Sequence, residues 1–250
     1  MVSTRRELLG LITAAASSPL IGRPQRLIRA LAFDAFVLYD PRIIVARARE
    51  MAGEKGDALV SAASAKLFAY TWYYTSAGRY AGFGELASDA FSSASQTIGL
   101  NLSNAGLERL VGGYANLELW PDVRAALQTL RRQKIRLAML SNLSEHVLGA
   151  NLRARGIDQY FEFILSTDQA QHYKPSPKAY DLAVRAFKAP RDQIGFAASA
   201  SWDASGATWF GFPSVWVNRN GFSGEQAHAT PAIVSRGMDG VLQLAGVPAT

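Results

Sequence analysis

Short runs of apolar, β-forming residues recur along the chain, and most of them are separated by helix-like patterns. The runs are apolar on both faces and are followed by small or polar residues, which is typical of buried strands. They cover residues 31–35, 135–140, 161–165, 194–198 and 214–217. Before each of the last four runs, apolar residues recur at helical spacing, in segments 122–132, 144–155, 178–187 and 203–210. Strands that alternate with helices predict an α/β fold with a parallel sheet and right-handed crossovers.

The segment 41–120 breaks this alternation. It is rich in alanine and aromatic residues at helical spacing, it contains no good strand pattern, and several glycines interrupt it. We interpret it as an all-helical cap domain inserted after the first strand of a core domain formed by residues 30–40 and 121–250. An insert near the carboxyl ends of parallel strands is well placed to cover a ligand site. The tail beyond Gly221 has only weak patterns.

The first residues have the layout of a secretory signal. Arg5 and Arg6 precede a short apolar run that is followed by small residues, and this arrangement resembles a twin-arginine signal. On this interpretation residues 1–22 direct export to the periplasm. The alternative is an amphipathic N-terminal helix with a chance arginine pair, and a cytoplasmic protein. The apolar run is too short to cross a bilayer, and we expect no stable membrane span elsewhere.

Composition narrows the possible chemistry. The chain has 250 residues, of which 49% are hydrophobic and 18% charged, as in ordinary globular proteins. Because it contains no cysteine, disulfides, thiolate nucleophiles and cysteine metal sites are excluded. Its three histidines are scattered, so a metal site would need carboxylates. The net charge of +6 is compatible with an anionic partner, but no interleaved basic and aromatic motif indicates nucleic-acid binding.

Residues able to carry chemistry follow four of the predicted strands. They are Asp34, then Ser141 and Asn142, then Lys174 beyond a short loop, and finally Asp203. The carboxyl ends of parallel strands meet at one edge, where ligands bind. A carboxylate in a dry pocket can act as a nucleophile, and a lysine beside it keeps it ionised. Each residue alone would be an ordinary cap, turn or surface residue, but their order and placement together favour a functional site.

These motifs resemble the haloacid dehalogenase superfamily and, more closely, its type II (S)-2-haloacid dehalogenases. The resemblance covers about residues 31–219. Its most specific segments are 140–142, 173–175 with Tyr180, 201–207, 210–213 and 216–219, together with 70–72 and 78–83 in the insert. The resemblance implies a Rossmann-like core with a helical cap.

The resemblance also implies a mechanism. Asp34 would attack C2 of a 2-haloalkanoate and displace halide with inversion, and water would then hydrolyse the aspartyl ester. Ser141 and the amide at Asn142 would bind the substrate carboxylate, and Lys174 would pair with Asp34.

The remaining site residues are implied in the same way. Asp203 and Tyr180 would support Lys174, and Tyr180 is counted with the substrate-binding residues. Phe36, Phe83 and Trp202 would form an apolar wall around the alkyl group. Phosphatases of the superfamily need an acidic residue two places after the nucleophile to hold magnesium, and Phe36 stands there. We therefore expect a metal-independent reaction with no cofactor.

Three positions depart from the family pattern. The first motif, residues 34–40, is one residue short and lacks the usual glycine and threonine. Ser64 stands where the cap usually supplies an arginine that helps to bind halide. Residues 198–200 read Ala, Ser, Ala where the family has Ser, Ser, Asn, so a hydroxyl and an amide that help to place the hydrolytic water are missing.

Three functional hypotheses follow. The first is a hydrolase of the dehalogenase type, with a small anionic carboxylate as substrate. The second is an inactive exported relative that binds a small carboxylate, and the third is a magnesium phosphatase, against which Phe36 argues. The family often dimerises, so the resemblance also allows a homodimer.

Overall fold

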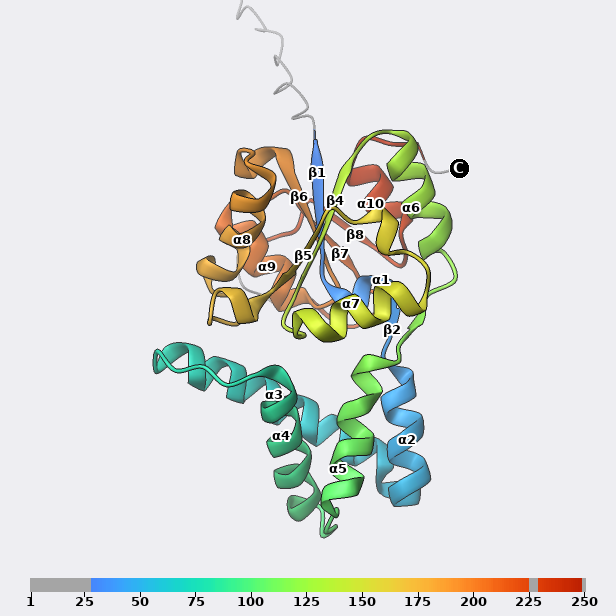
Figure 1. The fold of residues 1–250 in the computed structure, drawn as a ribbon, viewed down its shortest axis with the longest axis vertical. Coiled ribbons are helices and arrows are strands. Elements are labelled where there is room, and N and C mark those ends of the chain that lie inside the picture. The colour runs from blue at the N-terminus through green and yellow to red at the C-terminus, as the bar shows by residue number, and fades with distance from the viewer. Residues whose placement is uncertain (1–27, 225–228, 249–250) are drawn as a thin grey trace, which may run out of the picture.

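The computed structural model describes residues 28–224 and 229–248, and a six-stranded sheet lies at the centre of the larger part (Figure 1). The strand order is β5-β4-β1-β6-β7-β8, and every neighbouring pair is parallel. The strands are β1 (Ala30–Phe33), β4 (Arg136–Ser141), β5 (Phe163–Ser166), β6 (Ile194–Ala198), β7 (Ser214–Val217) and β8 (Ile233–Ser235). The predicted α/β class is confirmed.

Helices cover both faces of the sheet because both faces of its strands are apolar. In β1, Leu31 and Phe33 belong to one buried cluster, and the intervening Ala30 and Ala32 belong to another. This alternation follows the two-residue period of a strand. The first cluster includes residues of α6 (Val123–Arg132), α7 (Glu145–Ala154) and α10 (Asp239–Leu244), and the second includes residues of α8 (Pro177–Phe187) and α9 (Ser201–Phe210).

Some strand boundaries differ from the predictions. β1 ends at Phe33 rather than at residue 35, because Asp34 caps the short helix α1 (Ala35–Leu38) by accepting a hydrogen bond from the backbone N–H of Phe36. β5 begins two residues later than predicted, after a 3-10 turn at Asp158–Tyr160. The edge strand β8 was not predicted, since its three residues are half-buried or exposed and have no apolar run.

Four helices form the cap, which lies beyond the carboxyl edge of the sheet (Figure 1). They are α2 (Arg42–Ala52), α3 (Gly56–Ser76), α4 (Phe83–Thr97) and α5 (Asn104–Val111). The cap joins the core through β2 (Tyr39–Asp40), which pairs antiparallel with β3 (Glu118–Leu119). The expectation of no strand within 41–120 was therefore wrong at its end, because a two-residue strand is too short to show a period.

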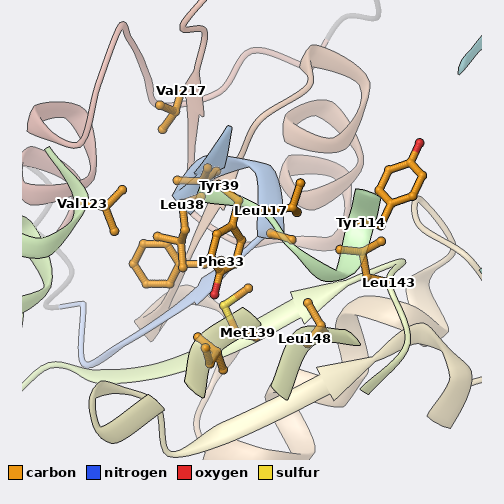
Figure 2. Packing of buried hydrophobic residues seen from close by; sticks show 14 of the residues in the cluster. Phe33, Leu38, Tyr39, Tyr114, Leu117, Val123, Met139, Leu143, Leu148 and Val217 are labelled. Carbon is orange, nitrogen blue, oxygen red and sulfur yellow. The ribbon is translucent and has the colours of Figure 1, made fainter. Parts of the chain in front are cut away.

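One hydrophobic cluster continues from the core into the cap (Figure 2). Two segments link the core to the cap, one entering it at β2 and one leaving it at β3. Phe33 and Met139 from the sheet pack with Leu38 and Tyr39 of the first segment and with Leu117 of the second. All five side chains are at most 2% exposed. Each large side chain buried in this way stabilises the fold by about 1.5–3 kcal/mol. The two linking segments are thus fixed by packing as well as by their strand pair.

The signal segment predicted for residues 1–22 lies outside the described residues. In the part of the chain that the structure does describe, no helix combines the length and hydrophobicity needed to cross a membrane.

Candidate active site

The fold brings the residues that follow four strands to one edge of the sheet. Asp34 follows β1, Ser141 ends β4, and Asn142 comes next. Lys174 lies in the segment between the 3-10 turn Thr167–Gln169 and α8, and Asp203 lies in the first turn of α9. All five residues line the same cavity. The strand ends predicted this convergence.

A buried ion triad forms the floor of the cavity. The ammonium Nζ of Lys174 lies 2.9 Å from Oδ1 of Asp34 and 2.7 Å from Oδ2 of Asp203, and it also donates to the carbonyl oxygen of Leu140 at 3.3 Å. The Lys174 side chain is 1% exposed. All three of its donors are therefore used, which offsets the high cost of removing the charge from water.

Four donors hold the carboxylate of Asp34. Oδ2 accepts from the hydroxyl of Ser199 at 2.6 Å and from the backbone N–H of Phe36 at 3.1 Å. Oδ1 accepts from Lys174 and, at the long distance of 3.4 Å, from the hydroxyl of Ser141. The carboxylate plane is thus fixed, and Oδ1 is the less saturated oxygen.

Ser199 is a site residue that sequence reasoning missed. It is the first residue after β6, at the same sheet edge as the predicted residues. Its position directly after a predicted strand could have identified it as a site residue. In the shortened motif after β1 no threonine follows Asp34, and Ser199 supplies a hydroxyl to the carboxylate from the neighbouring strand instead.

The electrostatics of the two carboxyl groups differ. Burial raises the pKa of Asp34, but the Lys174 ammonium and the Ser199 and Phe36 donors together hold it below its ordinary value. Burial raises the pKa of Asp203 to about 6, with Lys174 opposing the shift and the negative charge of Asp34 adding to it. Burial lowers the pKa of Lys174, but its two carboxylate partners raise it above the ordinary value. Near neutral pH, Asp34 is ionised beside a charged lysine.

Tyr180 supports the triad from behind. Its hydroxyl donates to Oδ1 of Asp203 at 2.7 Å, and the side chain is fully buried. It is not among the residues that line the cavity, so its contact is with Asp203 and not with a ligand, contrary to its grouping with the substrate-binding residues. Gly206 permits this arrangement, because a Cβ there would lie 2.6 Å from the Tyr180 hydroxyl.

Aromatic contacts between core and cap flank the cavity, whose volume is about 540 Å³. Phe36 of the core contacts Tyr114 of the cap, with ring centroids 6.3 Å apart, and Tyr114 also contacts Phe83 within the cap at 5.1 Å. Trp202 of the core contacts Phe68 of α3 at 5.0 Å. The three predicted wall residues Phe36, Phe83 and Trp202 all line the cavity.

Two arginines that the predicted site did not include also line the cavity. Arg42 pairs with Asp40, and Arg219 pairs with Asp122 at 2.9 Å. Their guanidinium carbons lie 5.1 and 4.8 Å from the ring centroid of Trp120. The contacts of the two arginines with Trp120 join residues far apart in the sequence, so no local pattern indicated them.

The side chains at the floor of the cavity do not favour binding of a metal ion. Asp34 and Asp203 both bind the Lys174 ammonium, which occupies the place between the carboxylates that a cation would take. Among residues 28–224 and 229–248, no three His, Cys, Asp or Glu side chains form a group that could hold a metal.

Comparison with known proteins gives consistent matches. A family model described as haloacid dehalogenase-like hydrolase matches residues 28–211. Haloacetate dehalogenase H-2 of Moraxella sp. is 34% identical over 221 residues, which are 88% of this chain and 99% of that protein. The (S)-2-haloacid dehalogenase of Pseudomonas sp. (strain YL) is also 34% identical, over 82% of this chain and 88% of its own.

Solved structures resemble the fold as a whole. The crystal structure of the L-2-haloacid dehalogenase RSc1362 has a TM-score of 0.85 and 35% identity, and the match covers 88% of this chain and all of that one. A second structure, described as a dehalogenase, has a TM-score of 0.81 and 30% identity over 87% of this chain and 96% of its own.

Proposed function

We propose that this chain, which belongs to the haloacid dehalogenase-like hydrolase family, hydrolyses the carbon–halogen bond of (S)-2-haloacids through an ester formed on Asp34. The observation that carries the proposal is the buried, ionised carboxylate of Asp34, held by four donors at the floor of a cavity with aromatic walls. A carboxylate held this way is oriented for attack and has little competition from water.

The first step forms the ester. Oδ1 of Asp34 attacks C2, the C2–halogen bond breaks, and its electron pair leaves on the halide, with inversion at C2. Ser141 takes part by changing its hydrogen-bond partner. In the structure its hydroxyl lies 3.4 Å from Oδ1 of Asp34. When the hydroxyl donates to the substrate carboxylate instead, a lone pair of the attacking oxygen becomes free.

Asn142 is the second group that binds the substrate carboxylate. Its side-chain oxygen accepts from the backbone N–H of Lys174 at 3.1 Å, which directs its amide nitrogen away from that bond. Within the described residues this nitrogen has no hydrogen-bond partner. A neutral amide and a hydroxyl bind a carboxylate while leaving the charge of Lys174 to Asp34.

The second step regenerates the nucleophile. Water adds to Cγ of the ester, the bond from Cγ to the substrate-bearing oxygen breaks, and the 2-hydroxyacid leaves. Asp34 returns as a carboxylate that carries one oxygen from water. The two steps together release one halide and one proton for each hydroxyacid formed. Asp203 and Tyr180 act throughout by keeping Lys174 in place.

Halide release by the purified chain tests this function. We expect release from the S form of 2-chloropropionate and not from the R form, unaffected by a chelator. Asp34→Asn keeps the shape of the side chain but removes the nucleophile, and it should lower turnover by at least about 10⁴-fold. The variant should still bind propionate, measured as an upward shift in Tm.

The alternatives give different results. A folded chain that releases no halide from either form but is stabilised by propionate would be a carboxylate binder. Phosphate release that depends on magnesium would indicate a phosphatase, and either outcome would overturn the proposal.

We also propose that the chain is exported, since Arg5 and Arg6 precede a short apolar run. A fusion of residues 1–30 to a reporter should reach the periplasm of a bacterial host, and a paired change of both arginines to lysine should keep it inside. Equal periplasmic signal from both fusions would contradict twin-arginine export.

A further inference from the structure

We propose that the cap side of the cavity is a subsite for a bulky apolar group on C2, so that the substrates are 2-haloacids with a long alkyl or arylalkyl chain. This inference rests on the proposed function and names its substrate class. It is drawn from the α3 wall, the charge balance around the cavity and the size of the cavity.

One face of α3 forms the cap-side wall. Val60, Ser64, Leu67, Phe68 and Thr71 line the cavity, and their spacing of three to four residues places them on one side of a helix. From residue 60 to residue 71 the wall is about 16 Å long, at about 1.5 Å per residue. A haloacetate or 2-chloropropionate molecule would contact only a small part of it.

The polar groups on this wall are few and do not call for a charged ligand. The hydroxyl of Thr71 donates to the carbonyl oxygen of Phe68 at 2.8 Å, so it is already satisfied. Ser64 supplies a neutral hydroxyl. The remaining wall residues of α3 are apolar, and burying them against a hydrocarbon chain is favourable.

The cations around the cavity are all paired. Among the described lining residues, Lys174 binds Asp34 and Asp203, Arg42 binds Asp40, and Arg219 binds Asp122. The far end of a ligand would therefore meet no unpaired positive charge. A second carboxylate on the substrate would find no unpaired cation among these residues, whereas an apolar end would contact Val60, Leu67 and Phe68.

Phe222 provides a further apolar contact at the cavity. It is 68% exposed although it lines the cavity. Two hydrogen bonds with the side chain of Asn218 hold the backbone of Phe222. The N–H of Phe222 donates to Oδ1 of Asn218 at 2.9 Å, and Nδ2 of Asn218 donates to the carbonyl oxygen of Phe222 at 2.8 Å. An exposed aromatic ring on a backbone segment that is held by hydrogen bonds is available to cover an alkyl or aryl group.

The size of the cavity supports the same class. Its volume of about 540 Å³ lies within the range of about 300–1,000 Å³ typical of pockets that bind drug-sized molecules. A three-carbon acid would leave much of the space to water.

A substrate series tests the inference. Halide release is measured for the S forms of 2-bromopropionate, 2-bromobutyrate, 2-bromohexanoate and 2-bromooctanoate. We expect kcat/KM to rise by about threefold per methylene up to the hexanoate, close to the value of burying a methylene group. A series that is flat or falls with chain length would overturn the inference while leaving the proposed function intact.

A pair of variants locates the subsite. Val60→Trp fills the α3 wall, and it should reduce the ratio of kcat/KM for the octanoate to that for the propionate by at least about tenfold. Ala65→Trp places the same ring at an exposed position of α3 that does not line the cavity, and it should change this ratio less than twofold. An equal effect of both substitutions would contradict the assignment.

Binding without turnover separates the two proposals. Octanoate should raise the Tm of the wild-type chain more than propionate does at equal concentration. If no substrate releases halide, the proposed function fails, and the Tm series alone then decides whether the apolar subsite exists. A larger shift with propionate would overturn it.

Discussion

The two sides of the cavity are built differently. The core side is a closed polar network, in which Lys174, Asp34 and Asp203 are at most 6% exposed and each donor has a named acceptor. The cap side is an apolar wall on α3 that includes Phe68 and, at Ser64, an exposed hydroxyl. On the core side, hydrogen bonds fix the position of each charged group, whereas the cap side is defined only by its shape and polarity.

This difference indicates how the two sides tolerate change. A buried network loses much when one member is removed, because the remaining charges stay buried and unpaired. An apolar wall can exchange one residue for another of similar volume at modest cost. We therefore expect the chemistry to depend on the core side and the choice of substrate to depend on the cap side.

Among changes to the residues that support Asp34, the largest effect should follow from Lys174→Met, which leaves Asp34 and Asp203 buried without their cation. Breaking a buried pair in this way costs about 3–5 kcal/mol of folding free energy, measured by urea unfolding. Halide release should fall by about 10²–10³-fold. Arg49→Ala, which breaks the exposed pair with Asp57, is the control and should leave the urea midpoint unchanged. Equal shifts for both variants would refute the difference between buried and exposed pairs.

The site shows which features a sequence can predict. Asp34, Ser141, Asn142, Lys174 and Asp203 were predicted because each follows a strand of a parallel sheet, and such positions converge for any sequence with that topology. Their roles required the resemblance to a family, because the strand ends alone indicate a site and not a reaction.

The features that were not predicted depend on tertiary contacts or on very short elements. Ser199 also follows a strand, but a hydroxyl there is ordinary until the Asp34 carboxylate is seen 2.6 Å away. Arg219 reaches Trp120 across 99 positions of the chain. The strand pair β2–β3 and the edge strand β8 contain only two or three residues per strand, which is too few for a period to be detected.

A smaller effect should follow from Ser199→Ala. Loss of the hydroxyl leaves Oδ2 of Asp34 with the Phe36 N–H as its remaining donor, so the carboxylate plane is less fixed. We expect kcat to fall by about 10–100-fold with little change in KM. Ser199→Thr keeps the hydroxyl and should restore most of the rate. Failure of threonine to restore it would indicate that the loss comes from altered packing.

The pH dependence tests the coupling within the core side. The pKa of Asp203 is raised to about 6, so kcat/KM should fall below that pH, by about tenfold at pH 5. The midpoint belongs to the coupled carboxyl groups and not to one residue. Asp203→Asn should move this acid limb to lower pH, toward the lowered pKa of Asp34. If the acid limb of the kcat/KM profile stays at the same pH in this variant, Asp203 does not contribute to that limb.

The same groups predict how stability changes with pH. The raised pKa of Asp203 means that the folded chain holds this proton more tightly than the unfolded chain, so its contribution to stability is lost as the pH rises from about 4 to about 6. The lowered pKa of Asp34 has the opposite sign, and its contribution is lost as the pH falls below the ordinary range of an aspartate. Urea unfolding of Asp203→Asn, which removes the first contribution, should show a smaller loss of stability with rising pH over that window than the unmodified chain shows.

The smallest effect is expected from Ser64→Ala on the cap side, the same chemical change as Ser199→Ala. Ser64 is exposed, lines the cavity and has no hydrogen-bond partner in the described part of the chain, so removing its hydroxyl breaks no bond. We expect kcat/KM for 2-bromopropionate to change by less than about threefold, and the longer 2-bromoacids to be affected no more than that. The two serine variants, assayed side by side, compare how much the rate depends on one hydroxyl group on the core side and on one hydroxyl group on the cap side. If Ser64→Ala lowered the rate as much as Ser199→Ala, the cap wall would have to hold a reacting group, and its hydroxyl would then be the first candidate for binding the departing halide.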